Sequence, residues 1–182
     1  MFGTVAAGKV LLMQGNLSAS TTRACLRLGR SQKTLTILNP SPLSTDEHPD
    51  WRDVDLVVAN AGELEALTGE ADPDAGATAL LRHGALAVVV TLGPRGAVYR
   101  DAAHRIEVVA PSVTARDTSG AGDVFCGVLA GLLARGRERG EALARATAAA
   151  SLSVTRPGAL ASSPTAAEIA ALSLPCPIRS LP

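Results

Sequence analysis

The feature that most constrains the fold of this chain is the alternation of short apolar runs with helical patterns. Short runs of mostly apolar residues recur along the sequence, and stretches with helical periodicity separate them. The predicted strands are 9–13, 34–38, 55–58, 87–90, 97–99 and 105–109. The predicted helices are 20–28, 61–67, 74–82, 120–134, 141–154 and 166–172. This alternation predicts an α/β domain with a sheet, because parallel strands need crossover helices between them.

Composition narrows the class of protein. A chain of 182 residues is long enough for one domain with a substantial core. The 17 basic and 17 acidic residues balance, and only 2% of residues are aromatic, so we expect neither a nucleic-acid nor a membrane partner. Three widely separated cysteines are typical of a reducing compartment, which predicts a cytoplasmic protein. We expect residues 1–174 to form the domain and the proline-rich residues 175–182 to form a loose tail.

The segment Asp117–Asp123 lies where a turn becomes the start of a predicted helix. Gly120 and Gly122 would let a phosphate approach the free backbone N–H groups of that helix start. A carboxylate at Asp123 would repel such a ligand, but it makes chemical sense as a base that takes a proton from an attacking hydroxyl. The alternative is helix capping, because a first-turn carboxylate also favours the helix dipole. Two glycines weaken a helix, so the pattern favours the chemistry of a kinase.

The segment Asn60–Glu63 also joins a predicted strand to a predicted helix. Asn60 is a natural N-cap, and Glu63 three residues later completes the pattern of a capping box. The functional alternative places Glu63 at the carboxyl edge of the sheet, where it would hold water around a magnesium ion. Mg²⁺ usually keeps several waters and uses few protein carboxylates. The residues alone leave both interpretations open.

The segment Thr91–Gly96 follows the most strand-like run of the chain. Its glycines and proline are ordinary residues of a plain turn. Loops at the carboxyl ends of parallel strands are also where α/β proteins bind ligands. Both interpretations stay open for this segment as well.

Six segments, in this order, resemble the ribokinase-like sugar kinases, also called the PfkB carbohydrate kinase family, and most of all its ribokinase branch. They are Leu12–Gln14, Asn39–Pro42, Asn60–Glu63, Thr91–Gly96, Asp117–Asp123 and Val154–Ala159. The resemblance covers nearly the whole chain. It implies a three-layer α/β sandwich, with a mostly parallel sheet flanked by helices, and transfer of the ATP γ-phosphate to the hydroxyl of ribose or a related pentose or hexose.

The resemblance also implies roles for individual residues. Asp123 would be the catalytic base that touches the substrate, and the amides of Gly120, Ala121 and Gly122 would form the anion hole for the developing charge. The residues that would bind the nucleotide are Asn60, Glu63, Thr91, Gly93, Arg95, Gly96, Gly122, Asp123 and Thr147. Those that would surround an activating K⁺, several through backbone carbonyls, are Asp117, Ser119, Ser153, Arg156, Gly158 and Ser162. Glu63 would also hold Mg²⁺ through water.

Two departures from the family pattern matter. Asn16 stands where ribokinases commonly carry a glutamate that touches the sugar, so a kinase for a nucleoside or a fructose derivative is an alternative. The long N-terminal part of the family, with a sugar-binding Asp, a GGKGAN-like segment and the lid strands, has no counterpart here. We therefore expect a C-terminal, nucleotide-binding portion with little sugar phosphorylation of its own, and a homodimer or aggregation through an unpaired sheet edge. A catalytically inactive nucleotide-binding remnant, or a regulatory module, is the second alternative.

Overall fold

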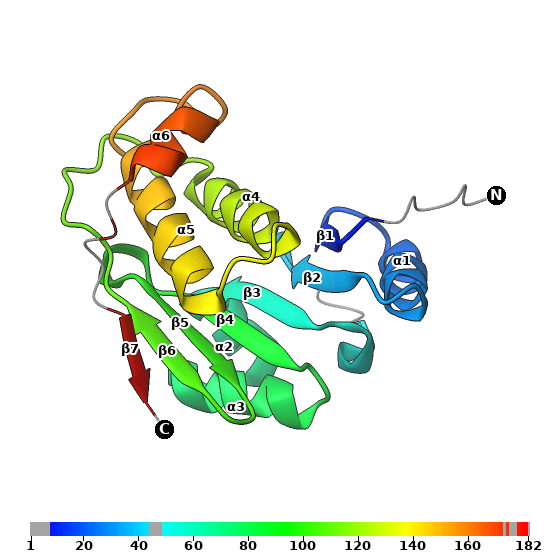
Figure 1. Cartoon of the computed structure of the whole chain (residues 1–182). Coiled ribbons are helices and arrows are strands. Elements are labelled where there is room, and N and C mark those ends of the chain that lie inside the picture. Colours follow the sequence, from blue (N-terminus) through cyan, green and yellow to red (C-terminus); the bar gives the residue numbers. More distant parts are fainter. Residues whose placement is uncertain (1–7, 44–48, 173, 175–177, 182) are drawn as a thin grey trace. The chain divides into compact units, whose positions relative to one another are not determined.

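The computed structural model describes residues 8–43, 49–172, 174 and 178–181 of the chain (Figure 1). The chain separates into two compact units. Unit 1 comprises residues 1–91 and 100–104, and unit 2 comprises residues 92–99 and 105–182. The boundary that we predict between a nucleotide-binding portion and a tail, at residue 174, stays a prediction.

Unit 1 is built on four parallel strands that pair in chain order. The strands are β1 (Val10–Gln14), β2 (Leu35–Asn39), β3 (Leu56–Asn60) and β4 (Ala87–Thr91). The helical elements between them are α1 (Ala19–Ser31), the 3-10 turn η1 (Trp51–Asp53), α2 (Ala61–Thr68) and α3 (Pro73–Arg82). In β3 and β4 every residue but the last is buried, as expected for parallel strands that are covered on both faces.

Helix α1 differs from its prediction in its buried face and in its end. The sequence predicts a helix with Ala24 and Leu28 on one face, ended by Gly29. In the structure Ala24 is exposed, and the buried residues of the helix are Thr22, Leu26 and Gly29. Gly29 does not end the helix, which continues to Ser31. A Cβ at Gly29 would lie 3.0 Å from a side chain of β1 and 3.0 Å from one of β2. The glycine is therefore a point of close helix–sheet approach and not a terminator.

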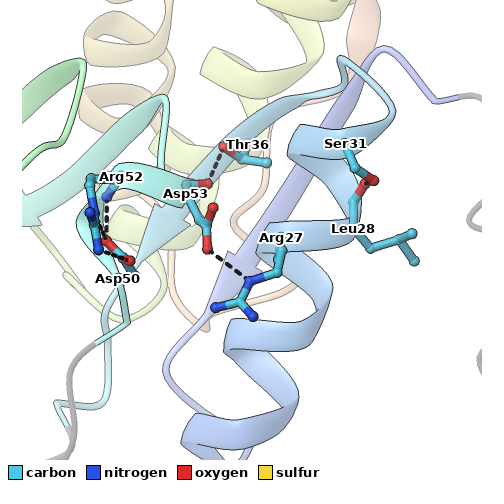
Figure 2. A network of polar contacts seen from close by, with 7 residues as sticks. All are labelled: Arg27, Leu28, Ser31, Thr36, Asp50, Arg52 and Asp53. Carbon is cyan, nitrogen blue, oxygen red and sulfur yellow. Dashed lines mark hydrogen bonds and ion pairs between the residues drawn. The ribbon is translucent and has the colours of Figure 1, made fainter.

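A polar network at the start of β2 holds that strand to the segment before β3 (Figure 2). The buried Thr36 hydroxyl donates to the carbonyl of Asp53 at 2.8 Å and accepts the N–H of Asp55 at 2.9 Å. The Asp55 carboxylate accepts the Thr36 N–H at 2.9 Å and a guanidinium N–H of Arg30 at 2.8 Å. Arg27 lies 3.6 Å from the Asp53 carboxylate. Because buried polar groups must be paired, this network fixes the amino ends of these strands.

Unit 2 combines a smaller strand assembly with the longest helices of the described chain. Its strands are the first part of β5 (Ala97–Asp101), then β6 (Arg105–Val108) and β7 (Ile178–Leu181). Its helical elements are η2 (Gly93–Arg95), α4 (Ala121–Ala134), α5 (Arg139–Ser153) and α6 (Ala166–Ala171). Helices α4 and α5 pack side by side (Figure 1).

Strand β7 lies inside the segment that the sequence predicts as a tail. It pairs antiparallel with β6, in a register that sets Val108 opposite Ile178 and Arg105 opposite Leu181. Parallel pairs in unit 1 and this antiparallel pair in unit 2 make the fold a mixed α/β fold, and the predicted class is confirmed. Among the described residues, no helix combines the length and the apolar character needed to cross a membrane.

Candidate active site

Polar residues end the parallel strands of unit 1 at one edge of their sheet. Asn60 and Thr91 are the last residues of β3 and β4, and they are register partners. Gln14 and Asn39 end β1 and β2 and are also register partners. Asn16 lies just beyond β1 in an exposed turn. The predicted residues of unit 1 therefore lie at the carboxyl ends of parallel strands, the usual ligand-binding edge of such sheets.

Glu63 forms the capping box that the sequence allows. Its carboxylate accepts the Asn60 N–H at 2.9 Å, and the Asn60 side chain accepts the Glu63 N–H at 2.8 Å. No group of three or more His, Cys, Asp or Glu residues that could hold a metal ion is found in the part of the chain that the structure describes. The Glu63 carboxylate is therefore engaged in the capping box, and its role near a magnesium ion stays a prediction.

The turn after β4 contains two glycines with different surroundings. Gly93 has φ 58°, and no other atom lies within 4 Å of the position that its Cβ would occupy. Gly96 has φ 104°, and its Cβ would collide with the carbonyl of Val108. The Val108 contact gives Gly96 a structural reason to be glycine, whereas the open space at Gly93 leaves room for a ligand. Arg95 is exposed beside them.

The start of α4 is the segment where the sequence predicts an anion site. Gly120 is the N-cap residue, with φ 76°, and no side chain caps this end of the helix. A Cβ on Gly120 would lie 3.1 Å from the Cβ and from the carbonyl oxygen of Ala159, so this position requires glycine for two reasons. The Ala121 N–H donates to the Thr118 carbonyl over 3.3 Å, at the long end of the hydrogen-bond range.

Asp123 and Gly122 are both exposed in the first turn of α4. Nothing lies within 4 Å of the position that a Cβ on Gly122 would occupy. The fold itself therefore does not demand a glycine there, and the open space allows a ligand to approach the backbone closely. An exposed carboxylate beside uncapped helix amides can accept a proton from a bound hydroxyl group.

The Asp117 carboxylate joins two loops of unit 2. One oxygen accepts the Ser119 N–H at 2.9 Å, and the other accepts the Gly158 N–H at 2.8 Å. These backbone hydrogen bonds, Ser119 first and Gly158 second, lower the pKa of Asp117. The carboxylate is thus kept charged between two segments of irregular backbone, where carbonyl groups could surround a monovalent cation.

The other residues predicted near the cation or nucleotide lie in α5 and the loop after it. The Ser153 and Ser162 side chains are buried and donate to the nearby carbonyls of Ala150 and Ala159. The Arg156 side chain forms an ion pair with Glu168 of α6, so the role predicted for Arg156 at the cation would fall to its backbone. Thr147 is buried in α5 and donates to the Leu143 carbonyl at 2.9 Å. Unit 2 therefore brings Asp117, Ser119 and Gly158 together, while the roles of all these residues stay predictions.

A groove that the sequence does not indicate follows α4 for most of its length, from Gly120 to Arg135. We call it the α4 groove; its volume is about 740 Å³. One wall is α4, with Gly127 and Gly131, and the other is formed by residues of α5, α6 and the preceding loop, including Leu160. Leu160 is 88% exposed. Its only sequence signal is a leucine in a loop of small residues, which does not distinguish a functional apolar group from a tolerated one.

Comparison with known proteins gives the site a context. The model of the pfkB family of carbohydrate kinases matches residues 3–166. A ribokinase of Mus musculus is 36% identical over 138 residues, which cover 71% of this chain and 43% of that protein. The solved ribokinase of Thermotoga maritima superposes with a TM-score of 0.83 at 32% identity, over 90% of this chain and 56% of the other. The solved Arabidopsis thaliana ribokinase, complexed with ribose and ATP, superposes with a TM-score of 0.84 at 25% identity, over 89% and 55%.

The chain spans about half the length of the relatives that it matches. The predicted α/β fold of the ribokinase type is nevertheless confirmed, because the superpositions cover nine tenths of the chain with high TM-scores. The family model likewise covers most of the sequence, from before β1 into α6. The chain belongs to the pfkB family of carbohydrate kinases.

Proposed function

We propose that this chain carries the nucleotide-binding portion of a kinase that transfers the γ-phosphate of ATP to a sugar hydroxyl. The observation that supports this most is the start of α4. The N-terminus of α4 has no side-chain cap, and its N-cap residue Gly120 has a left-handed conformation. The space at Gly122 is open, and the exposed carboxylate of Asp123 lies in the same turn.

In this proposal each residue has a defined task. Asp123 takes the proton from the sugar hydroxyl as that oxygen attacks the phosphorus, and the amides of the first helical turn stabilise the negative charge on the transferring phosphoryl group. In unit 1, Asn60, Thr91 and Glu63 bind the nucleotide and its water-held Mg²⁺. In unit 2, the residues assigned to the nucleotide are Gly93, Arg95, Gly96, Gly122 and Thr147.

The proposal includes a monovalent cation and a cellular compartment. Asp117 orients two loops whose backbone carbonyls would hold K⁺, together with the turns at Ser153, Arg156 and Ser162. A bound K⁺ would supply positive charge near the anion site at the start of α4. The cytoplasm is the compartment that we propose.

The sugar is proposed as a class. The solved Arabidopsis relative is complexed with ribose and ATP, which makes ribose the first sugar to test. Asn16, exposed beyond β1, keeps a nucleoside or a fructose derivative as the alternative acceptor.

Calorimetric titration of the chain with MgATP, with and without K⁺, tests the proposal. We expect saturable binding that Gly122→Leu weakens, because the side chain would fill the space in front of the helix amides. Gly131→Leu is the matched control, since it makes the same change on the same helix two turns beyond the site. An absence of MgATP binding by the folded wild-type chain would overturn the proposal and favour the inactive remnant.

The catalytic assignment has a separate test, in which ADP release is measured with ribose and related sugars. Asp123→Asn removes the base, and we expect any sugar-dependent turnover to fall by about 10²- to 10⁴-fold at saturating MgATP. Turnover that survives in Asp123→Asn would show that another group is the base.

A further inference from the structure

Helix α6 is attached to the rest of unit 2 through polar contacts. None of its six residues, all of which the structure describes, is buried. A helix of this length is not stable by itself in water, because nucleation of the first turn is unfavourable. The contacts that hold α6 in place therefore come from outside the helix, at its two ends.

The N-terminal end of α6 is attached to the loop after α5. One oxygen of the Glu168 carboxylate forms an ion pair with the Arg156 guanidinium. The other oxygen accepts the Thr165 N–H at 2.7 Å and the Thr165 hydroxyl at 2.9 Å. Glu168 therefore caps its own helix and also fixes the side chain of a residue in the loop.

The C-terminal end of α6 is attached to α5. Arg145 of α5 donates from one guanidinium nitrogen to the carbonyls of Ile169 and Leu172, at 3.3 and 3.5 Å. A second nitrogen of Arg145 donates to Glu141, one turn earlier in α5, at 3.1 Å, which holds the guanidinium in this position. A cation at the carbonyl end of a helix is favourable, because it pairs with carbonyls that have no partner within the helix.

The loop after α5 makes close contacts with the turn before α4. The Val154 carbonyl accepts the Asp117 N–H at 3.1 Å, and the Asp117 carboxylate accepts the Gly158 N–H at 2.8 Å. Ala159 fills the space beside Gly120, where a Cβ on Gly120 would lie 3.1 Å from the Ala159 Cβ. The position of this loop therefore sets the position of the turn that precedes the proposed anion site.

Capping of α6 explains only part of this arrangement. Thr165 and Glu168 form a complete capping box, and that motif needs no arginine. The Arg156 and Glu168 side chains are 34% and 36% exposed, and an ion pair of this exposure adds little to the free energy of folding. Its main effect is geometric, because Arg156 lies between Val154 and Gly158 and the pair fixes the loop there.

We infer that Glu168 is a positioning residue for the proposed anion site at the start of α4. Its ion pair with Arg156 holds the loop after α5 against the turn before α4. Arg145 supports this by fixing the other end of α6 on α5. The inference deepens the proposed function and rests on it for the ligand, whereas the contacts themselves do not depend on a ligand.

Limited proteolysis with trypsin tests the contact without any ligand. Arg116 is exposed in the turn before α4, and its N–H donates to the Val154 carbonyl at 2.7 Å. Cleavage after Arg116 requires this turn to open, so its rate reports the open population. Glu168→Gln keeps the size of the side chain and removes its charge, and we expect cleavage after Arg116 to become about two- to fivefold faster. Cleavage after Arg82, at the end of α3, should not change.

Two further variants serve as the control and as a second disruption. Glu107→Gln makes the same change in another ion pair of unit 2, with Arg105, and it should leave the rate of cleavage after Arg116 unchanged. Arg145→Gln releases the other end of α6 and should raise that rate. An unchanged rate in Glu168→Gln would overturn the inference.

Charge exchange separates positioning from capping. Glu168→Arg places two cations beside each other and should raise the rate of cleavage after Arg116 more than Glu168→Gln does. Adding Arg156→Glu should lower the rate again, because the two charges then attract although the capping box is lost. A double variant that shows no recovery would overturn the inference, since Glu168 would then act only as a cap.

Calorimetric titration with MgATP connects the contact to the site. Glu168→Gln should weaken MgATP binding by about two- to fivefold, and Glu107→Gln should leave it unchanged. Unchanged binding in Glu168→Gln, with a wild-type chain that binds MgATP, would overturn the positioning role. A wild-type chain that binds no MgATP would overturn the proposed function, and the rates of cleavage after Arg116 would then decide alone whether Glu168 holds the loop.

Discussion

Helices α4 and α5 lie side by side, have nearly the same length and use their residues in opposite ways (Figure 1). In α5 the N-terminus is capped by the Glu138 side chain, and alanines such as Ala144 and Ala146 are fully buried. In α4 the N-terminus has no side-chain cap, and glycines are exposed along one side. Helix α5 thus has a capped N-terminus and a packed surface, whereas α4 leaves backbone groups exposed.

This difference separates small residues that packing requires from small residues that packing does not require. Alanine in α5 is small because neighbouring atoms fill the space around it. Glycine in α4 is small although the space around it is empty. A small residue in a crowded place is required by packing, whereas a glycine in an open helical position is not.

The largest expected effect comes from enlarging a small residue of α5. Ala144→Leu places extra atoms in a fully buried position and should lower the free energy of unfolding by about 1–3 kcal/mol. Gly127→Leu adds an even larger group to α4, and it should leave the stability of the monomer unchanged or slightly raised. Urea unfolding of both variants at low protein concentration measures the contrast. Equal losses in the two variants would remove the distinction between the helices.

Gly120, the N-cap residue of α4, is a glycine that contacts within the chain require. Gly120→Ala would force alanine into the left-handed region and press its Cβ against Ala159, which lies 3.1 Å away. We expect a loss of about 1–2 kcal/mol in the free energy of unfolding. Chemical denaturation beside Gly122→Ala, an open position in the same turn, is the measurement. A neutral Gly120→Ala would mean that the turn before α4 can relax.

The cap of α5 should have a moderate effect. The Glu138 side chain accepts the Glu141 N–H at 3.0 Å, so Glu138→Ala leaves that donor without its partner. We expect a loss of about 1 kcal/mol, read from the melting temperature. Glu138→Asp should retain most of the stability, because aspartate is itself a good cap. An unchanged melting temperature for Glu138→Ala would show that α5 is held by packing alone.

The smallest effect concerns α6, which forms part of the wall opposite α4. Hydrogen bonds from Arg156 and from the Thr165 N–H lower the pKa of Glu168 from 4.5 to about 2. A carboxylate whose pKa is lower in the folded chain stabilises the fold fully above its unfolded pKa, and this contribution is lost as the pH falls from 4.5 towards 2. Glu168→Gln should therefore reduce the pH dependence of the melting temperature within that window. Identical acid profiles for the variant and the wild type would contradict this.

Local patterns predict most of the fold. The strands of unit 1 lie within about two residues of their predicted positions, because β-branched runs and their flanking turns are short-range signals. The capping box of α2 follows from two residues three positions apart, and both of its hydrogen bonds are present. Helix α1 was harder to predict because its buried face includes Gly29, whose role depends on contacts with two strands. Strand β7 has only four residues after prolines, and its existence depends on β6, about seventy residues earlier.

The candidate site also has features that the local sequence predicts and features that depend on contacts between distant segments. The turn before α4 and the exposed Asp123 could be predicted from the residue types in one short segment. The contact that makes Gly120 necessary comes from Ala159, and the α4 groove is walled by three elements that the sequence does not bring together. These features arise from packing between distant segments, which no window of residues contains.

The Asp117 carboxylate has a consequence for local motion. Its two oxygens hold the amides of Ser119 and Gly158, which are separated by 39 positions in the chain. Neither amide hydrogen can exchange with solvent while the carboxylate holds it. Rotation of this one side chain exposes both amides at once, so their exchange rates should rise and fall together. The turn before α4 and the loop after α5 would thus open and close together.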